Sequence, residues 1–328
     1  MQASVQLLRN LTLAVAELGC DPALVLGEAS LSWKDLETGD GEERRVPVEV
    51  LRRFWTAAVS VTGDPSIGVR VGARARLEHF GVLGEVLRGS ATLGDALLRT
   101  GRYMRLWIES TRLSLLVEGE QGQVFCRSDA PEPHPSALQS LLATLLVLSR
   151  ELTGLELVPN RVRIASPAPE DDSVFRDVFG VAPTFDEGES ALVFPSDVLM
   201  LPVAARGARA QPSAASPGAA LSRRVRDVLA AELQGGNPMI ENVAAQLGIH
   251  PKTLTRRLKQ EGTSHSELLD SLRRELAEQH LSASTLNVTE VAFLLGFSDA
   301  SAFNKAFRRW FGVGPLAFRR GPRPPATH

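Results

Sequence analysis

The sequence predicts a two-domain protein in which an α+β domain is followed by an all-α domain. The chain has 328 residues, roughly twice the most common domain length of about 100–150 residues. Residues 206–219 are rich in Ala, Ser, Pro and Gly and lack apolar periodicity, as is typical of a flexible linker. Helical and strand patterns alternate before this stretch, whereas every pattern after it is helical. We therefore expect domains at 1–205 and 220–323.

The N-terminal domain mixes helices and strands along the chain. Apolar residues recur at helical spacing over 48–61, and Gly63 ends that pattern. Thr92 and Asp95 form a capping signal at the start of another helix. Alternating runs on either side of 119–122 predict a β-hairpin. Further helices are expected over 136–152 and 172–179, and further strands over 161–164 and 191–194.

The C-terminal domain contains the same pattern twice. Residues 243–249 read VAAQLGI and residues 291–297 read VAFLLGF, and a basic stretch follows each of them. A short apolar helix, a glycine, an apolar residue and a second helix are the sequence form of a helix-turn-helix motif. The second helix of such a motif enters the major groove of DNA. We place the two motifs at about 241–260 and 288–311.

A linker helix is expected between the two motifs. Ser264 and Glu267 form a capping box that opens it, and Asn287 and Glu290 form the equivalent start of the second motif. At 1.5 Å per residue the linker helix is roughly 20 Å long. Such a helix would hold the two reading helices about one duplex turn apart, on the order of 34 Å.

The second helix of each motif has a polar face that can contact DNA. Arg and Lys can donate to guanine or to phosphates, Asn can pair with adenine, and Thr offers a hydroxyl and a methyl group. An amphipathic bundle with a solvated basic face is the alternative for one motif, but two copies joined by a capped helix disfavour it. The candidate DNA-binding residues are Lys252, Thr255, Arg256, Lys259, Ser301, Asn304, Lys305 and Arg308.

The charge distribution agrees with a nucleic-acid site near the C-terminus. The whole chain has a net charge of −2. Residues 221–323 carry 15 Lys and Arg against 10 Asp and Glu (net +5), and residues 1–220 carry 21 against 28 (net −7). A basic third on an acidic body favours local binding of a polyanion.

Other classes of site have no signal in the sequence. Cys20 and Cys126 are too few for a disulfide framework or a structural zinc site, and the six histidines lack metal-ligand spacing. We therefore expect no metal, no cofactor and no structural disulfide. No apolar run approaches the roughly 18 residues that a membrane span requires. The N-terminus lacks the features of a signal peptide, so we expect a cytoplasmic protein.

Residues 241–320 resemble the DNA-binding domain of the AraC/XylS transcription regulators. The most specific stretch is VAFLLGFSDASAFNKAFRRWFG at 291–312, and LRRELA at 272–277 is similar to the family's linker helix. Residues 1–200 resemble the arabinose-binding-like sensor of ornithine-type regulators, in pieces such as GDPSIG at 63–68. This resemblance implies a bacterial, effector-responsive regulator of transcription, often an activator and a homodimer. Its implied partners are double-stranded promoter DNA, RNA polymerase and a small polar metabolite.

A polar and aromatic cluster in the first domain is the candidate effector site. Such groups can orient a small anion or an amino acid, although a helix end with a solvated basic edge and a Trp anchored in the core is the more common arrangement. The cluster consists of Arg102, Tyr103, Arg105 and Trp107.

There are two alternatives to effector control, of which the second is disfavoured. In the first, the N-terminal domain only dimerises and the regulator is constitutive. In the second, an enzyme is fused to the DNA-binding domain, for example a methyl-accepting repair protein with a reactive cysteine. Such a cysteine needs an electropositive setting. Cys126 lies in a strand pattern beside Phe125 and Cys20 precedes an acidic turn, so the sequence predicts no enzyme.

Overall fold

The computed structural model describes residues 1–37, 44–131, 133–204, 220–233, 236, 238–283 and 286–321. The chain separates into two compact units, residues 1–207 and 208–328. The linker expected at 206–219 lies outside the described residues. No helix in the described part of the chain is long and apolar enough to cross a membrane.

The first part of the N-terminal unit is a group of helices around its own apolar core. Phe54, Trp55 and Leu8 are among its most deeply buried side chains. Gly63 has a φ of 64° and ends the predicted helix as expected. Strand β1 (Gln2–Ser4) pairs antiparallel with β2 (Arg45–Pro47) beside this group. Its helices are α1 (Val5–Glu17), α2 (Pro22–Glu28), the 3-10 helix η1 (Trp33–Leu36), α3 (Val48–Thr62) and α4 (Ile67–Ala73).

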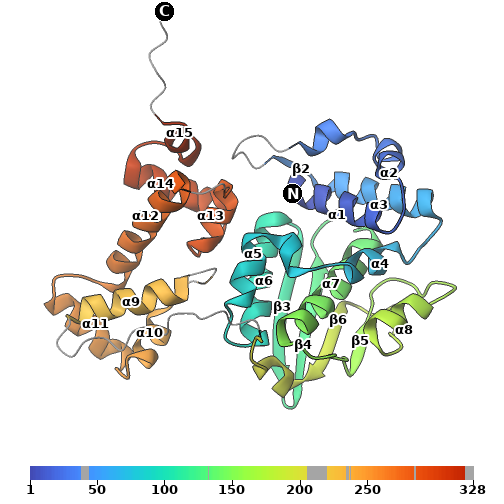
Figure 1. Cartoon of the computed structure of the whole chain (residues 1–328). Coiled ribbons are helices and arrows are strands. Elements are labelled where there is room, and N and C mark those ends of the chain that lie inside the picture. Colours follow the sequence, from blue (N-terminus) through green and yellow to red (C-terminus); the bar gives the residue numbers. More distant parts are fainter. Residues whose placement is uncertain are drawn as a thin grey trace, which may run out of the picture. The chain divides into compact units, whose positions relative to one another are not determined.

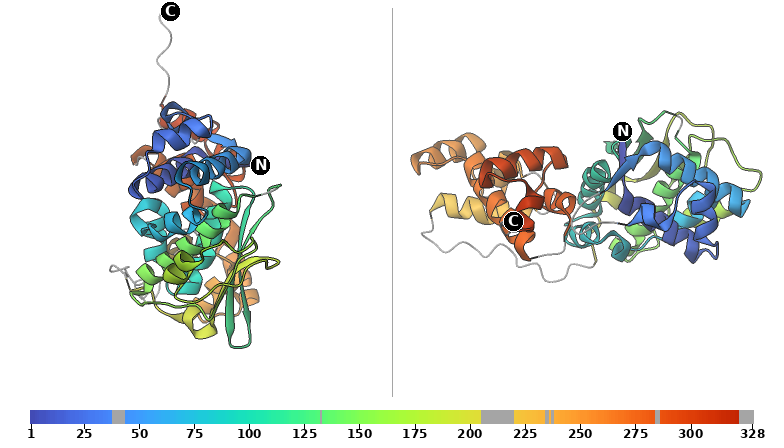
Figure 2. Two further views of the ribbon diagram at one scale, coloured as in Figure 1. Left: turned by 90° about the vertical axis from the view of Figure 1, so that its right-hand side faces the viewer. Right: turned by 90° about the horizontal axis from the view of Figure 1, so that it is seen from above.

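The second part of this unit is a four-stranded antiparallel sheet with helices packed on it (Figures 1 and 2). The strand order is β3 (Thr111–Glu118), β4 (Gln121–Ser128), β6 (Ser190–Pro195) and β5 (Arg161–Arg163). The predicted hairpin is confirmed, with a tighter turn, because both strands extend to Glu118 and Gln121. Its remaining elements are η2 (Leu77–Phe80), α5 (Val82–Arg88), α6 (Leu93–Trp107), α7 (Pro135–Thr153), α8 (Ser173–Phe179) and η3 (Ser196–Met200).

Helices α4 and α7 approach each other unusually closely. A Cβ added at Gly68 or Gly72 of α4 would clash with backbone atoms of Ser136 or Ser140 in α7. Only glycine therefore allows the two helix backbones to lie at this separation. This contact joins the helical group to the helices of the sheet.

The described residues of the C-terminal unit form helices and no strand. The order of α10–α11 and α13–α14 agrees with two helix-turn-helix motifs on either side of α12. The helices are α9 (Leu221–Leu233), α10 (Ile240–Gln246), α11 (Pro251–Gln260), α12 (His265–Ala283), α13 (Val288–Leu294), α14 (Ala300–Phe311) and α15 (Pro315–Arg319).

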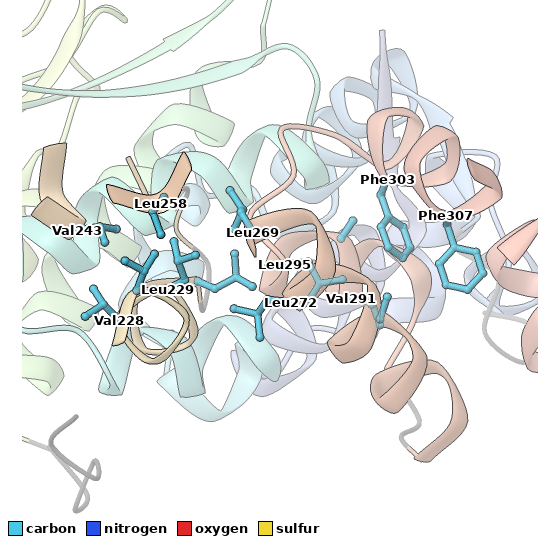
Figure 3. Packing of buried hydrophobic residues seen from close by; sticks show 14 of the residues in the cluster. Val228, Leu229, Val243, Leu258, Leu269, Leu272, Val291, Leu295, Phe303 and Phe307 are labelled. Carbon is cyan, nitrogen blue, oxygen red and sulfur yellow. The ribbon is translucent and has the colours of Figure 1, made fainter. Parts of the chain in front are cut away.

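One apolar core runs through the whole C-terminal unit. Leu269 and Leu272 of α12 lie between Leu258 of the first motif and Leu295 of the second (Figure 3). Leu229 of α9 also contributes to this core. Because interiors pack as densely as organic crystals, a shared core restricts movement of one motif against the other.

The linker helix is longer than the sequence pattern suggested. Helix α12 has 19 residues and is therefore about 28 Å long rather than roughly 20 Å. The expected cap is present, since the Ser264 hydroxyl accepts from the backbone N–H of Glu267 at 3.2 Å. In the second motif, Asn287 and Glu290 form a complete capping box, with N–H to oxygen distances of 2.9 and 2.8 Å.

Candidate nucleic-acid interface

The turn of the first motif is built as its sequence predicts. Gly248 lies between α10 and α11 with a φ of 65°, the left-handed conformation that glycine adopts at little cost. The His250 side chain caps α11 by accepting from the backbone N–H of Lys252 at 3.3 Å. A histidine thus fills the position where serine or threonine is usual.

Helix α11 has one buried and one exposed face. Leu254 and Leu258 are fully buried in the shared core. The opposite face carries no large apolar side chain, so it can approach a polar partner without exposing the core. All four predicted contact residues are exposed: Lys252, Thr255, Arg256 and Lys259.

Helix α14 repeats this arrangement in the second motif. Asp299 caps the helix by accepting from the backbone N–H of Ala302 at 2.6 Å. Phe303 and Phe307 are fully buried, with ring centroids 5.6 Å apart. On the other side, the predicted residues Ser301, Lys305 and Arg308 are exposed and Asn304 is half-buried.

Asn304 makes a local hydrogen bond that bears on its predicted role. Its Nδ2 donates to the carbonyl oxygen of Ala300 at 2.9 Å. An amide nitrogen carries two N–H groups, so one donor and the Oδ1 acceptor remain. These are the two groups that pair with N7 and N6 of adenine.

Arg273 of α12 holds the turn of the second motif. Its guanidinium donates to the carbonyl oxygens of Leu295 at 2.8 Å and Gly296 at 3.0 Å, and it lies 4.7 Å from the ring centroid of Phe297. Burial lowers the pKa of Arg273 from its usual value. Arg273 is not among the predicted contact residues, although its position beside the buried residues of a linker helix is a signal that the sequence contains.

Asp270, one turn earlier on α12, fixes the end of α14. Its carboxylate accepts from Trp310 Nε1 at 2.9 Å and also pairs with the Arg309 guanidinium. Arg309 is therefore tied to the linker helix, whereas its neighbour Arg308 lies exposed among the predicted contact residues. Together with Arg273, this contact orients the second motif on α12.

Comparisons with known proteins agree with this architecture. A model described as the arabinose-binding domain of the AraC transcription regulator, N-terminal, matches residues 19–203, and a helix-turn-helix domain model matches residues 243–321. The chain is 31% identical over 320 residues to the ornithine utilization regulator of Pseudomonas aeruginosa, which covers 94% of this chain and 93% of that protein. The chain belongs to the AraC family of transcription regulators.

Two further similar proteins are transcriptional regulators by name. The regulator VirS of Mycobacterium tuberculosis is 29% identical over 284 residues, 81% of this chain and 82% of that one. The crystal structure of the transcriptional regulator CdpR from Pseudomonas aeruginosa matches 84% of this chain and 92% of its own, with 26% identity and a TM-score of 0.46. The two family models and the ornithine utilization regulator confirm the resemblance read from the sequence, and this AraC-family chain is a DNA-binding transcription regulator.

The three described members of the predicted effector cluster do not line one common cavity in this AraC-family chain. Arg102 is exposed, whereas Tyr103 and Trp107 are buried with ring centroids 5.0 Å apart. The side chain of Arg105 lies outside the described residues. Among the three described members, only Trp107 borders a well-defined cavity of the unit.

That cavity has a volume of about 590 Å³ and lies between α1, α3, α6 and α7. Its walls come from segments far apart in the sequence, which explains why no local pattern revealed it. The volume is within the usual range for small-molecule sites, about 300–1,000 Å³.

The two cysteines have surroundings that favour the thiol. Cys126 is buried, and burial raises its pKa. Burial and the nearby Asp21 raise the pKa of Cys20. Since the thiolate is the reactive form, neither cysteine has the electropositive setting of an alkyl-accepting nucleophile.

Proposed function

We propose that this AraC-family chain reads promoter DNA with α11 and α14 together, under the control of a small molecule bound by its N-terminal unit. The observation that carries the DNA part is the continuous core through α12, which joins two reading helices with exposed polar faces. Each helix would enter one of two successive stretches of major groove.

The contact residues divide into three groups in this proposal. Arg256 and Asn304 read base edges, because guanidinium and amide groups pair with guanine and adenine in two places. Lys252, Lys259 and Lys305 neutralise phosphates, which gives affinity without sequence preference. The remaining residues, Thr255, Ser301 and Arg308, contribute at the edges of the reading faces.

The N-terminal unit is proposed as the sensor, with residues 1–205 as its extent. The cavity beside Trp107 supports this role, and both cysteines lack the setting of a nucleophile, so we propose no catalytic activity. The same proposal includes four further properties of the protein. It forms a homodimer, contacts RNA polymerase, activates transcription and is located in the cytoplasm.

Selection of bound DNA tests the reading function. Purified full-length protein is incubated with random duplexes, and the retained DNA is sequenced. The proposal predicts one enriched site with two short elements about one helical turn apart. Enrichment of a single short element would mean that one motif alone reads bases.

Ligand titrations test the sensor role. L-ornithine and L-arabinose are the first probes, because a relative and a family model carry those names, and organic acids follow. An effector must favour one state of the regulator, and a coupling of roughly 1–3 kcal/mol would change operator affinity about 5- to 150-fold. A ligand that binds without changing operator affinity would contradict effector control. The alternative would then stand, in which the regulator is constitutive and its N-terminal unit only dimerises.

A further inference from the structure

The walls of the cavity in the N-terminal unit are mainly apolar. Helices α1, α3, α6 and α7 contribute aliphatic and aromatic side chains that face one another across it. Phe80 stacks on Trp107 with ring centroids 6.0 Å apart and extends this surface. Apolar residues on the walls include Leu7, Leu11, Leu51, Trp55, Trp107 and Leu138.

Some of the polar side chains at the walls already have partners within the protein. Arg52 donates to the carboxylate of Glu49 through Nε at 2.9 Å. His134 accepts from the backbone N–H of Ser136 at 3.2 Å, and Asn10 donates to the carbonyl of His79 at 3.2 Å. Because most of the wall is apolar, a sugar or amino acid buried here would find few partners for its polar groups, and unpaired buried polar groups are costly.

Glu17 is an exposed carboxylate at the cavity. Of the two guanidinium groups there, Arg74 differs from Arg52. It lies at the end of α4 and is exposed, and no described carboxylate lies within ion-pairing distance of it. By contrast, Arg52 already has a carboxylate partner. Arg74 therefore offers a guanidinium at the edge of an apolar space, and carboxylates are natural partners of guanidinium groups.

We propose that this cavity takes an apolar monocarboxylate, with its acyl chain or ring system between α1, α3 and α7 and its carboxylate at Arg74. The inference rests on the proposed sensor function and names the chemical class of its effector. It replaces the small polar metabolite that the sequence resemblance implied. Burial of the apolar body supplies affinity, and the charge contact at Arg74 supplies orientation.

Calorimetric titration of the full-length protein with hexanoate, octanoate and decanoate tests this inference. Affinity should rise about three- to fourfold for each added methylene group that enters the cavity. The uncharged probe 1-octanol should bind about tenfold more weakly than octanoate, because it lacks the charge-assisted contact. L-arabinose and L-ornithine should not compete with octanoate.

Substitutions assign the binding to this cavity. Arg74→Gln should weaken the binding of octanoate about tenfold and leave the affinity for 1-octanol unchanged. Arg53→Gln is the matched control, because Arg53 is exposed on α3 and does not border the cavity. Ala14→Phe and Ala137→Phe place a ring in the cavity from opposite walls and should abolish binding of both probes. Circular dichroism of each variant identifies those that keep the native fold.

Two results would overturn the inference. The first is equal affinity for hexanoate and decanoate, or for octanoate in wild type and Arg74→Gln. The second is competition of octanoate by L-arabinose or L-ornithine. Operator titration is a separate measurement: octanoate that binds as expected without changing operator affinity supports the ligand class and contradicts effector control. DNA binding controlled only by a polar probe contradicts the ligand class and supports effector control.

Discussion

Arg256 and Lys259 lie on the same exposed face of α11, yet their removal should have different consequences. Arg256→Ala should reduce discrimination at one base pair by about 1–3 kcal/mol, because a guanidinium pairs with guanine in two places. Lys259→Ala should weaken binding to all DNA sequences by a similar factor. It should also lower the slope of log affinity against log salt concentration by about one, because one phosphate contact is lost. Gel-shift titrations at several salt concentrations, with matched and mismatched duplexes, measure both quantities.

Arg257→Ala is the control for this comparison. Arg257 is exposed next to Arg256 but lies outside the predicted contact set. Its removal should leave base preference unchanged. If Arg256→Ala and Arg257→Ala select the same DNA as wild type, the assignment of the reading face on α11 is wrong.

The two turn glycines should differ in their tolerance of substitution. Both have positive φ, 65° at Gly248 and 68° at Gly296, so alanine is strained by about 1 kcal/mol at either position. At Gly296 an added Cβ would also clash with the carbonyl oxygen of Gly236, and at Gly248 it would meet nothing. Gly296→Ala should therefore destabilise the C-terminal unit by a further 1–3 kcal/mol, approximately.

Differential scanning calorimetry measures the thermal stability of these two variants. The transition assigned to the C-terminal unit should fall further for Gly296→Ala than for Gly248→Ala. Equal shifts for the two variants would show that strain in φ is the whole effect and that Gly236 moves away.

Helix α12 orients the second motif through specific contacts as well as through the core. Arg273→Ala removes two hydrogen bonds to the carbonyls of Leu295 and Gly296 and should cost about 2 kcal/mol. We expect a larger loss of affinity for a two-element site than for an element read by α11 alone. Fluorescence anisotropy with both duplexes separates the two effects.

Arg274→Ala is the matched control for Arg273→Ala. Its guanidinium lies 5.2 Å from the ring centroid of Phe311, and its loss leaves the turn carbonyls paired with Arg273. A positioning role for Arg273 would be contradicted if both variants lost a comparable amount of DNA affinity. It would also be contradicted if Arg273→Ala lost the same affinity for both duplexes.

Periodicity and caps predicted the elements of the C-terminal unit well, because those signals are local. The bounds of α13 and α14, the Asn287 cap and the burial of Phe303 all follow from spacing within a few residues. The length of α12 was underestimated, since its interior continues through polar residues that carry no end signal.

Contacts between distant segments could not be predicted from the pattern. The bond of Arg273 to the turn joins residues 22 positions apart, and the cavity combines walls from α1 to α7. The sequence drew attention to Arg102 and Tyr103, which are adjacent in the chain and are not among the residues lining this cavity. Local clusters of polar and aromatic residues do not reveal which side chains face a common space.

The C-terminal unit should fold and bind DNA by itself. Its core contains residues of α9 to α14, and the Glu261 carboxylate accepts from the backbone N–H groups of Leu221 and Ser222 at 2.9 Å. A fragment of residues 218–328 keeps both of these amides. Circular dichroism should show a cooperative helical transition, and gel shifts should show binding to the selected site. A fragment that is unfolded would place the domain boundary elsewhere.

Reading of two successive grooves by one chain is tested most directly by changing the spacing of the selected site. Insertion of about five base pairs between its two elements rotates one element by about half a turn, since a turn is roughly 10.5 base pairs. The shared core and the Arg273 contacts prevent α11 and α14 from following that rotation. Affinity of the full-length protein, measured by gel shift, should fall to that of a single element and recover in part when about ten base pairs are inserted. Affinity that is unchanged by the five-base-pair insertion would contradict two-motif reading.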